Sequence, residues 1–163
     1  MLAKEMLVTL YDFNTRANAR VLELAGRLSA EQYTTLTGQS HSNLQGLLVH
    51  VVRTMWVWRM LSQHSELPGT PPYTVDAFPS LEKLEIAWVD EDRLLRSYVE
   101  SLDDETLGET VLVRDWQGNI SPMVRWQMLV HLLMHNMQHR TEASAILTGF
   151  GHSPGDLDFI FFL

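Results

Sequence analysis

Three histidines recur at four-residue steps in a stretch of the chain whose apolar residues have helical spacing. They are His131, His135 and His139, and a fourth histidine, His50, lies in another apolar-rich stretch. Four residues of an α-helix turn through about 400°, so neighbours at this spacing lie on one face, a single turn apart. Two imidazoles placed in this way can bind one cation. The pattern therefore predicts a metal site.

Helix geometry limits how many of these histidines can share one ion. His131 and His139 would stand about 12 Å apart along a helix axis, whereas zinc–nitrogen bonds are about 2 Å long. Only one adjacent pair can chelate, and the spacing fits His131 with His135 as well as His135 with His139. A third ligand must come from elsewhere, and His50 is the candidate. The alternative is that these histidines are hydrogen-bonded structural residues beside an apolar stripe.

The composition is typical of one globular domain. Of the 163 residues, 45% are hydrophobic and 20% are charged, and a chain of this length can bury a sizeable core. We therefore expect a single domain over residues 1–163. With no run of eighteen apolar residues and no N-terminal export signal, we expect no membrane association and a cytoplasmic location.

Charge and cysteine content exclude several functions. The net charge of −8 disfavours nucleic acid as a partner, because that binding uses clustered Lys and Arg to neutralise phosphates. The chain has no cysteine, so it can form neither a disulfide nor a thiolate ligand or nucleophile. Any thiol in the chemistry must arrive as substrate.

Four long stretches have apolar residues at three- and four-residue steps, which predicts four helices. A proline-rich segment, residues 67–79, separates the second helix from the third, and residues 109–121 alternate apolar and polar residues about a glycine turn. The fold class we predict is all-α, a four-helix bundle with a long crossover between helices 2 and 3 and a small hairpin before helix 4. The helices are expected over residues 2–28, 43–64, 81–98 and 121–149.

Local signals predict where several of these elements begin. Ser29 and Ser42, each followed three residues later by glutamine, are typical capping boxes. Ser101 is expected to cap a further turn, and Ser121 with Pro122 is expected to open the last helix. The acidic side chains of the third helix are expected to face solvent; they are Glu82, Glu85, Asp90, Glu91 and Asp92.

Large apolar side chains at helical spacing are expected in the core, where some of them can line a pocket. This set comprises Met55, Trp56, Trp58, Trp126, Met134 and Met137. The remaining histidines, His41, His64 and His152, fall in predicted loops or at helix ends, where a histidine needs no special role. The Trp- and Met-rich helices also carry more apolar surface than one stripe requires, which favours a homodimer.

Several motifs together resemble the DinB/YfiT-like family of bacterial four-helix bundles, which is a damage-inducible family. They are the YDFNTRAN segment (residues 11–18), the LLVHVVRTMWVW segment (residues 47–58), the HNMQHR segment (residues 135–140), Gly149 and the LDFI ending (residues 157–160). The resemblance covers nearly the whole chain. Each motif is short, but their order, spacing and helical context point to the same family.

The resemblance implies which histidines bind the ion. In that family a helix-two histidine and two residues four apart on the last helix hold the metal, which corresponds to His50, His135 and His139. His131 would then only line the site. Arg140 matches the arginine that follows the last ligand. Thr141 and Glu142 stand where glycine and glutamine often follow, a departure expected to affect the surroundings of the ligands more than the ligands themselves.

A site with three nitrogen ligands leaves coordination positions open, as catalytic zinc sites do. Imidazoles suit zinc or nickel, among other divalent metals. The resemblance implies a metal-dependent enzyme acting on a small-molecule substrate, either a transferase that uses a low-molecular-weight thiol such as bacillithiol or mycothiol, or a hydrolase. It also implies a homodimer. The alternative is a non-catalytic metal- or ligand-binding, stress-related bundle or a dimeric scaffold.

Overall fold

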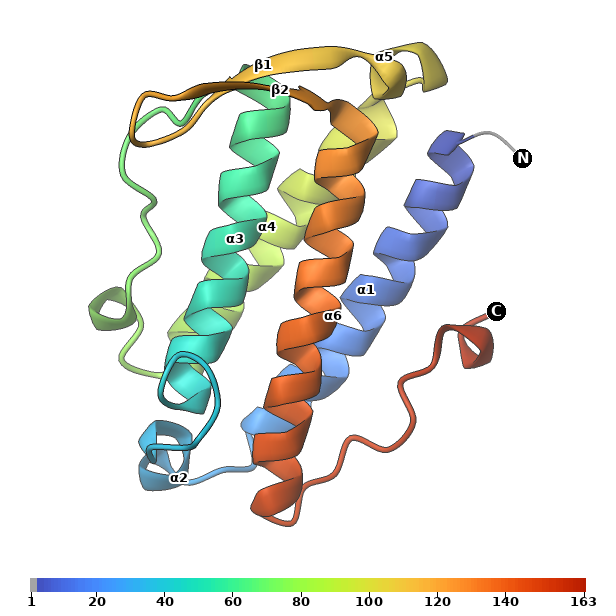
Figure 1. Ribbon diagram of the computed structural model, residues 1–163. Coiled ribbons are helices and arrows are strands. Elements are labelled where there is room, and N and C mark those ends of the chain that lie inside the picture. The colour runs from blue at the N-terminus through green and yellow to red at the C-terminus, as the bar shows by residue number, and fades with distance from the viewer. Residues whose placement is uncertain (1–2) are drawn as a thin grey trace.

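Four long helices form the body of the protein. The computed structural model describes residues 3–163, and its long helices are α1 (Ala3–Ala25), α3 (Leu44–His64), α4 (Leu81–Ser101) and α6 (Arg125–Gly149). They lie side by side as a bundle (Figure 1), so the predicted all-α four-helix fold is confirmed. Leu2, where the first helix was expected to start, lies outside the described residues.

The long crossover gives the bundle its topology. Residues 65–80, which include the short 3₁₀ helix η1 (Val75–Ala77), run back along the bundle after α3, so α4 starts at the same end as α3. Figure 1 shows α3 and α4 running parallel to each other and antiparallel to α1 and α6. Helix α6 packs between α1 and α3, and α4 closes the square on the other side. Consequently α3 and α6 are antiparallel neighbours.

Of the two predicted capping boxes, the one at Ser29 is confirmed and the one at Ser42 is wrong. Ser29 and Gln32 form a complete capping box at the start of the short helix α2 (Ala30–Thr34), as expected. Helix α3 is instead capped by Asn43, whose side-chain oxygen accepts a 2.8 Å hydrogen bond from the Gly46 N–H. Ser42 was the wrong residue, because its φ of 69° is left-handed and an N-cap needs an extended backbone.

The predicted start of the last helix is also wrong. Ser121 and Pro122 lie in strand β2 (Ile120–Val124), which pairs antiparallel with β1 (Thr110–Arg114). A two-stranded ribbon has only edges, so the missing N–H of Pro122 is tolerated there. Helix α6 therefore begins at Arg125. The hairpin itself is confirmed.

One more cap was misplaced at the end of α4. The short helix α5 (Asp104–Gly108) is capped by Asp103, whose carboxylate accepts a 2.7 Å hydrogen bond from the Thr106 N–H. Ser101 instead donates to the Tyr98 carbonyl oxygen inside α4. The predicted cap is therefore wrong by two residues, and the buried Leu102 lies between the two candidates.

Buried apolar side chains from all four long helices form one core. Its fully buried members include Leu24, Leu47, Met55, Leu84, Leu95, Leu129, Leu132 and Leu147. A smaller cluster fills the space beneath the hairpin, where Val111 and Val113 of β1 meet Val57 and Leu61 of α3 and Met128 of α6. The hairpin is thus packed across one end of the α3–α6 pair.

The acidic face of α4 is not wholly solvated. Glu91 is 1% exposed and pairs with Arg59 of α3 through two hydrogen bonds of 2.6 and 2.9 Å. Tyr73, in the crossover, donates a further hydrogen bond to Glu91. The expectation of a solvent-facing charge was therefore wrong for Glu91. Parallel packing of α3 and α4 places a buried arginine opposite it.

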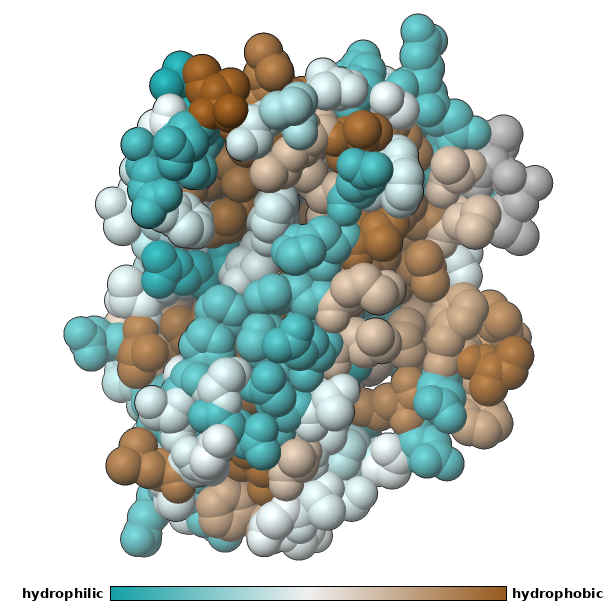
Figure 2. All heavy atoms as spheres, viewed as in Figure 1, coloured by the Kyte–Doolittle hydropathy of each residue, from teal (hydrophilic) through white to brown (hydrophobic). Residues whose placement is uncertain are grey.

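Several residues assigned to the core lie at the surface. Met55 is buried, and Trp56 and Trp58 are half-buried, but Trp126, Met134 and Met137 are each exposed by more than 40%. Figure 2 shows hydrophilic residues over much of the middle of the viewed face and hydrophobic ones gathered over the C-terminal segment. No helix among residues 3–163 has the length and hydropathy of a membrane span.

Neutralising Glu91 should destabilise the fold, because it leaves the buried Arg59 guanidinium without its counter-charge. For Glu91→Gln we expect a loss of about 3 kcal/mol in the free energy of unfolding, measured by urea denaturation. Asp90→Asn, one residue away but exposed, is the matched control and should change stability by less than about 0.5 kcal/mol. Equal stability of the two variants would contradict the pair's structural role.

Gly46 should resist replacement even though alanine is the better helix former. A Cβ at this position would lie 2.5 Å from the His41 carbonyl oxygen, so we expect Gly46→Ala to cost about 1–3 kcal/mol. Gly108, the last residue of α5, has nothing within 4 Å of such an atom. Gly108→Ala should therefore be neutral or slightly stabilising. Thermal unfolding of both variants tests the expectation, which fails if Gly46→Ala is as stable as the parent.

Candidate metal centre

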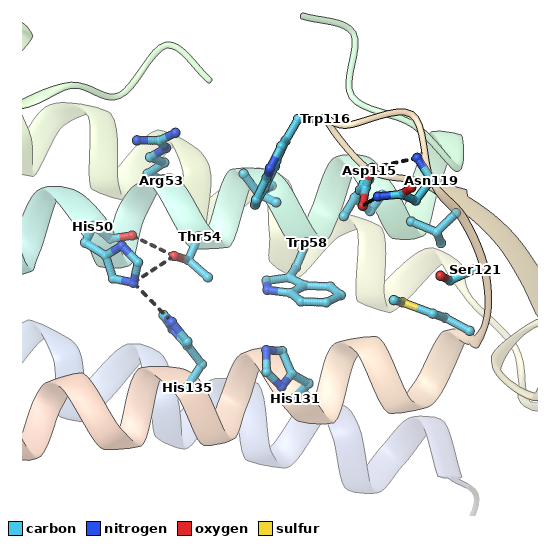
Figure 3. Close-up of a pocket in the computed structure, with 14 residues that line it drawn as sticks. His50, Arg53, Thr54, Trp58, Asp115, Trp116, Asn119, Ser121, His131 and His135 are labelled. Carbon is cyan, nitrogen blue, oxygen red and sulfur yellow. Dashed lines mark hydrogen bonds between the residues drawn. The ribbon is translucent and has the colours of Figure 1, made fainter. Parts of the chain in front are cut away.

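Helices α3 and α6 bring three histidine side chains together midway along their contact. The Nε2 atom of His135 lies 3.1 Å from Nε2 of His50 and 3.2 Å from Nε2 of His139. His50 comes from α3, and the other two come from successive turns of α6. His139 is buried, whereas His50 and His135 are half-buried. Figure 3 shows His50 and His135 pointing toward each other across the gap between the helices.

Hydrogen bonding alone explains this arrangement poorly. The Nε2 atom of a neutral imidazole has either one hydrogen or one lone pair, yet Nε2 of His135 has two close nitrogen neighbours. Three nitrogens around a tetrahedral ion at zinc–nitrogen distance are about 3.3 Å apart. The two observed separations are close to that value, so the donor set fits a divalent cation.

The environment keeps the rings of His50 and His135 uncharged at neutral pH. Burial, reinforced by the neighbouring histidines, lowers the pKa of His50 to about 3. Burial and the charges of His139 and His131 likewise lower the pKa of His135 to about 4. A metal binds only the neutral imidazole, so both rings have the form that coordination requires.

Glu142 orients one ring of the cluster. Its Oε2 atom lies 3.4 Å from Nδ1 of His139 and accepts a hydrogen bond from the Ser40 hydroxyl. Burial raises the pKa of Glu142, but the bonds from Ser40 and His139 outweigh it, and the net pKa is lowered. A carboxylate at Nδ1 favours the tautomer whose Nε2 has a free lone pair. The Glu142 side chain itself is half-buried beside the three histidines.

His41 lies beside the cluster, which its loop position did not predict. His41, His50 and His139 each place a ring nitrogen within 4.8 Å of the others, a grouping that could hold a metal ion. The rings of His41 and His50 are stacked, however, with centroids 3.8 Å apart and planes only 21° from parallel. The lone pairs of two stacked rings lie in two separate, nearly parallel planes. One ion about 2 Å from both nitrogens cannot lie in both planes, so the two rings do not share an ion in this arrangement.

His131 lies apart from this group. Its ring contacts the edge of Trp58, with centroids 4.6 Å apart, and its centroid is 6.0 Å from that of His135. The side chain is exposed and lines a cavity (Figure 3). This agrees with a lining role.

Arg140 fixes α6 against α1 directly behind the histidines. Its guanidinium is buried and donates hydrogen bonds to the side-chain oxygens of Asn14 and Asn18, at 2.9 and 3.0 Å. Burial lowers the pKa of Arg140 to about 10, so the side chain stays charged at neutral pH. These two asparagines belong to the YDFNTRAN segment of α1. The first and last motifs of the chain therefore meet in one contact.

A cavity of about 450 Å³ adjoins His50 and His135. Its walls come from α3, α6 and the hairpin, and Figure 3 shows Trp58 and Trp116 on its two sides. The wall residues of α3 recur at three- and four-residue steps from His50, a spacing that is visible in the sequence itself. These wall residues are Arg53, Thr54, Val57, Trp58 and Leu61.

The hairpin, which the sequence predicts only as a small element before the last helix, supplies another wall of this cavity. Val113, Asp115, Trp116 and Met123 line it from β1, the turn and β2. No spacing rule relates the turn to α3, because their contact depends on how the hairpin folds back over the bundle. The sequence therefore could not show this contribution.

Comparison with known proteins agrees with this architecture. No curated protein matches the chain. A crystal structure of a DinB-like protein from Bacillus subtilis superposes with a TM-score of 0.63 at 13% identity, covering 88% of this chain and 93% of the other. Identity this low shows a shared fold alone. The model of the DinB family matches residues 1–163, and the chain therefore belongs to the DinB family.

Proposed function

We propose that this protein is a metal-dependent enzyme in which His50, His135 and His139 hold one divalent metal ion. The observation that carries the proposal is the convergence of three Nε2 atoms, with His135 within 3.2 Å of both partners, beside a cavity large enough for a small molecule. Zinc or nickel suits three imidazoles, among other metals.

The neighbours of these rings support this ligand set. Glu142 contacts Nδ1 of His139, the arrangement in which a carboxylate orients a metal-binding imidazole. Nδ1 of His135 is buried without a hydrogen-bond partner among the described residues. Nε2 is therefore the atom through which this ring acts. His41 lies at the outer side of the group, stacked on His50.

Three protein ligands leave room for an exogenous group on the cavity side. A divalent cation held there lowers the pKa of a water or thiol that it binds and polarises a carbonyl group. This chemistry suits a transferase that uses a low-molecular-weight thiol, or a hydrolase. The protein's own groups orient the imidazoles, through Glu142, and shape the cavity.

The second candidate is a non-catalytic, metal-binding bundle. Its support is the His41 group, because a rotation of that ring would add a fourth protein ligand and close the site. The homodimer, the cytoplasmic location and the small-molecule substrate remain predictions. Metal coordination distinguishes the candidates, since a catalytic site keeps an open position and a structural site does not.

Removing any one proposed ligand should abolish metal binding. We expect the parent protein to hold one equivalent of zinc or nickel per chain, and His50→Ala, His135→Ala and His139→Ala to lose it, because two imidazoles bind far more weakly than three. Elemental analysis of purified protein measures this. His131→Ala is the matched control on the same helix and should keep its metal. A parent protein that binds no added zinc or nickel would refute the proposal.

Glu142 should strengthen metal binding without being a ligand. Glu142→Gln removes the carboxylate that orients His139, and we expect metal affinity to fall about 10- to 100-fold while stoichiometry stays at one ion. Competition with a chromophoric chelator gives the affinity. Glu109→Gln, which removes an exposed carboxylate far from the histidines, should leave affinity unchanged. Loss of stoichiometry in Glu142→Gln would instead make Glu142 a ligand.

A further inference from the structure

One cation on the cavity wall has no hydrogen-bond or ion-pair partner among residues 3–163. Arg53 lies one turn after His50 on α3, lines the cavity and forms no hydrogen bond, ion pair or ring contact with any residue of the described chain. A guanidinium offers five N–H donors that suit a carboxylate.

The nearby carboxylates of Asp115 and Glu66 contact other residues and not Arg53. Asp115 accepts hydrogen bonds from the backbone of Gln117 and Asn119 and from the Asn119 side chain, at 2.8 to 3.0 Å. Glu66, which shares a neighbouring hollow with Arg53, lies 3.8 Å from the Arg114 guanidinium. Arg53 is therefore the charged group of this wall that is free to meet a ligand.

The rest of the cavity lining is mixed, with apolar and aromatic side chains beside polar ones, which are Thr54, Asp115, Asn119, Ser121 and His131. Trp58 of α3 and Trp116 of the hairpin turn both line it (Figure 3), and so do Val57, Leu61 and Met123. Along α3 the wall passes from His50 through Arg53 to Leu61, a span of about 16 Å. On this α3 wall the histidine and the arginine therefore lie toward one end and the apolar Leu61 lies at the other.

We infer that this cavity binds small molecules that combine a carboxylate, held by Arg53, with an apolar or aromatic body, held between Trp58 and Trp116. That such a molecule is the substrate rests on the proposed function, because its reacting end would lie toward His50 and His135. The volume of about 450 Å³ is in the range of small-molecule sites. A neutral apolar compound would lose the charged contact, and a cationic one would be repelled.

Calorimetry with three matched probes tests this inference: 4-phenylbutyrate, 4-phenylbutanamide and 4-phenylbutylamine. Each is titrated into the full-length protein as purified. We expect the acid to bind about tenfold more tightly than the amide, as a charge-assisted hydrogen bond implies, and the amine to bind most weakly. Arg53→Gln should remove the preference for the acid, and Arg53→Glu should reverse the order of acid and amine.

The matched control is Arg93→Gln, an exposed arginine of α4 away from the cavity, which should keep the preference. Trp58→Leu should weaken acid and amide alike. The inference fails if acid and amide bind equally, if no probe binds, or if the preference survives in Arg53→Gln. A preference that disappears only in His139→Ala also overturns it, because the carboxylate would then bind at the histidines.

Metal content of the same samples separates this inference from the proposed function. If the protein holds no metal but shows the Arg53-dependent preference, the binding site stands and the proposed metal chemistry falls. If metal is bound as expected but the preference for the acid is absent, the proposed metal site stands and the Arg53 binding site falls.

Discussion

The close packing of α3 against α6 is the constraint on which the site depends. His50 comes from one helix, and His135 and His139 from the other, so their nitrogens meet only if the helices keep one separation, rotation and axial offset. Core leucines such as Leu47 and Leu132 set the separation. Because protein interiors are close-packed and deform little, a site built across such an interface is held rigidly without further bonds between its members.

Two buried arginines lock the other faces of the same helices. Arg59 ties α3 to α4 through a carboxylate, whereas Arg140 ties α6 to α1 through two neutral amides. The difference matters for the site. A buried carboxylate opposite Arg140 would neutralise the charge beside His139, whereas the amides satisfy hydrogen bonding and leave it positive. An anionic group at the histidines is favoured by such a charge.

The hairpin adds a wall to the cavity that lies between α3 and α6. A bundle of four helices has a groove between neighbouring helices but no wall above it, and the turn containing Trp116 supplies that wall. Its valines are anchored on α3 and α6 by a separate apolar cluster. Histidines on rigid helices beside a wall formed by a turn are an arrangement typical of proteins whose specificity resides in loops.

The sequence by itself determined the helices, the long crossover, the hairpin and the four-residue histidine ladder, because periodicity and turn residues act over short range. It left two chelating pairs equally possible, misplaced the start of α6, took Glu91 for a solvent-exposed group and gave His41 no place beside the other histidines. Those points depend on contacts between segments far apart in the chain. Which ring nitrogens meet, and which charge is buried, follows from the rotation and offset of packed helices, and only the tertiary structure decided them.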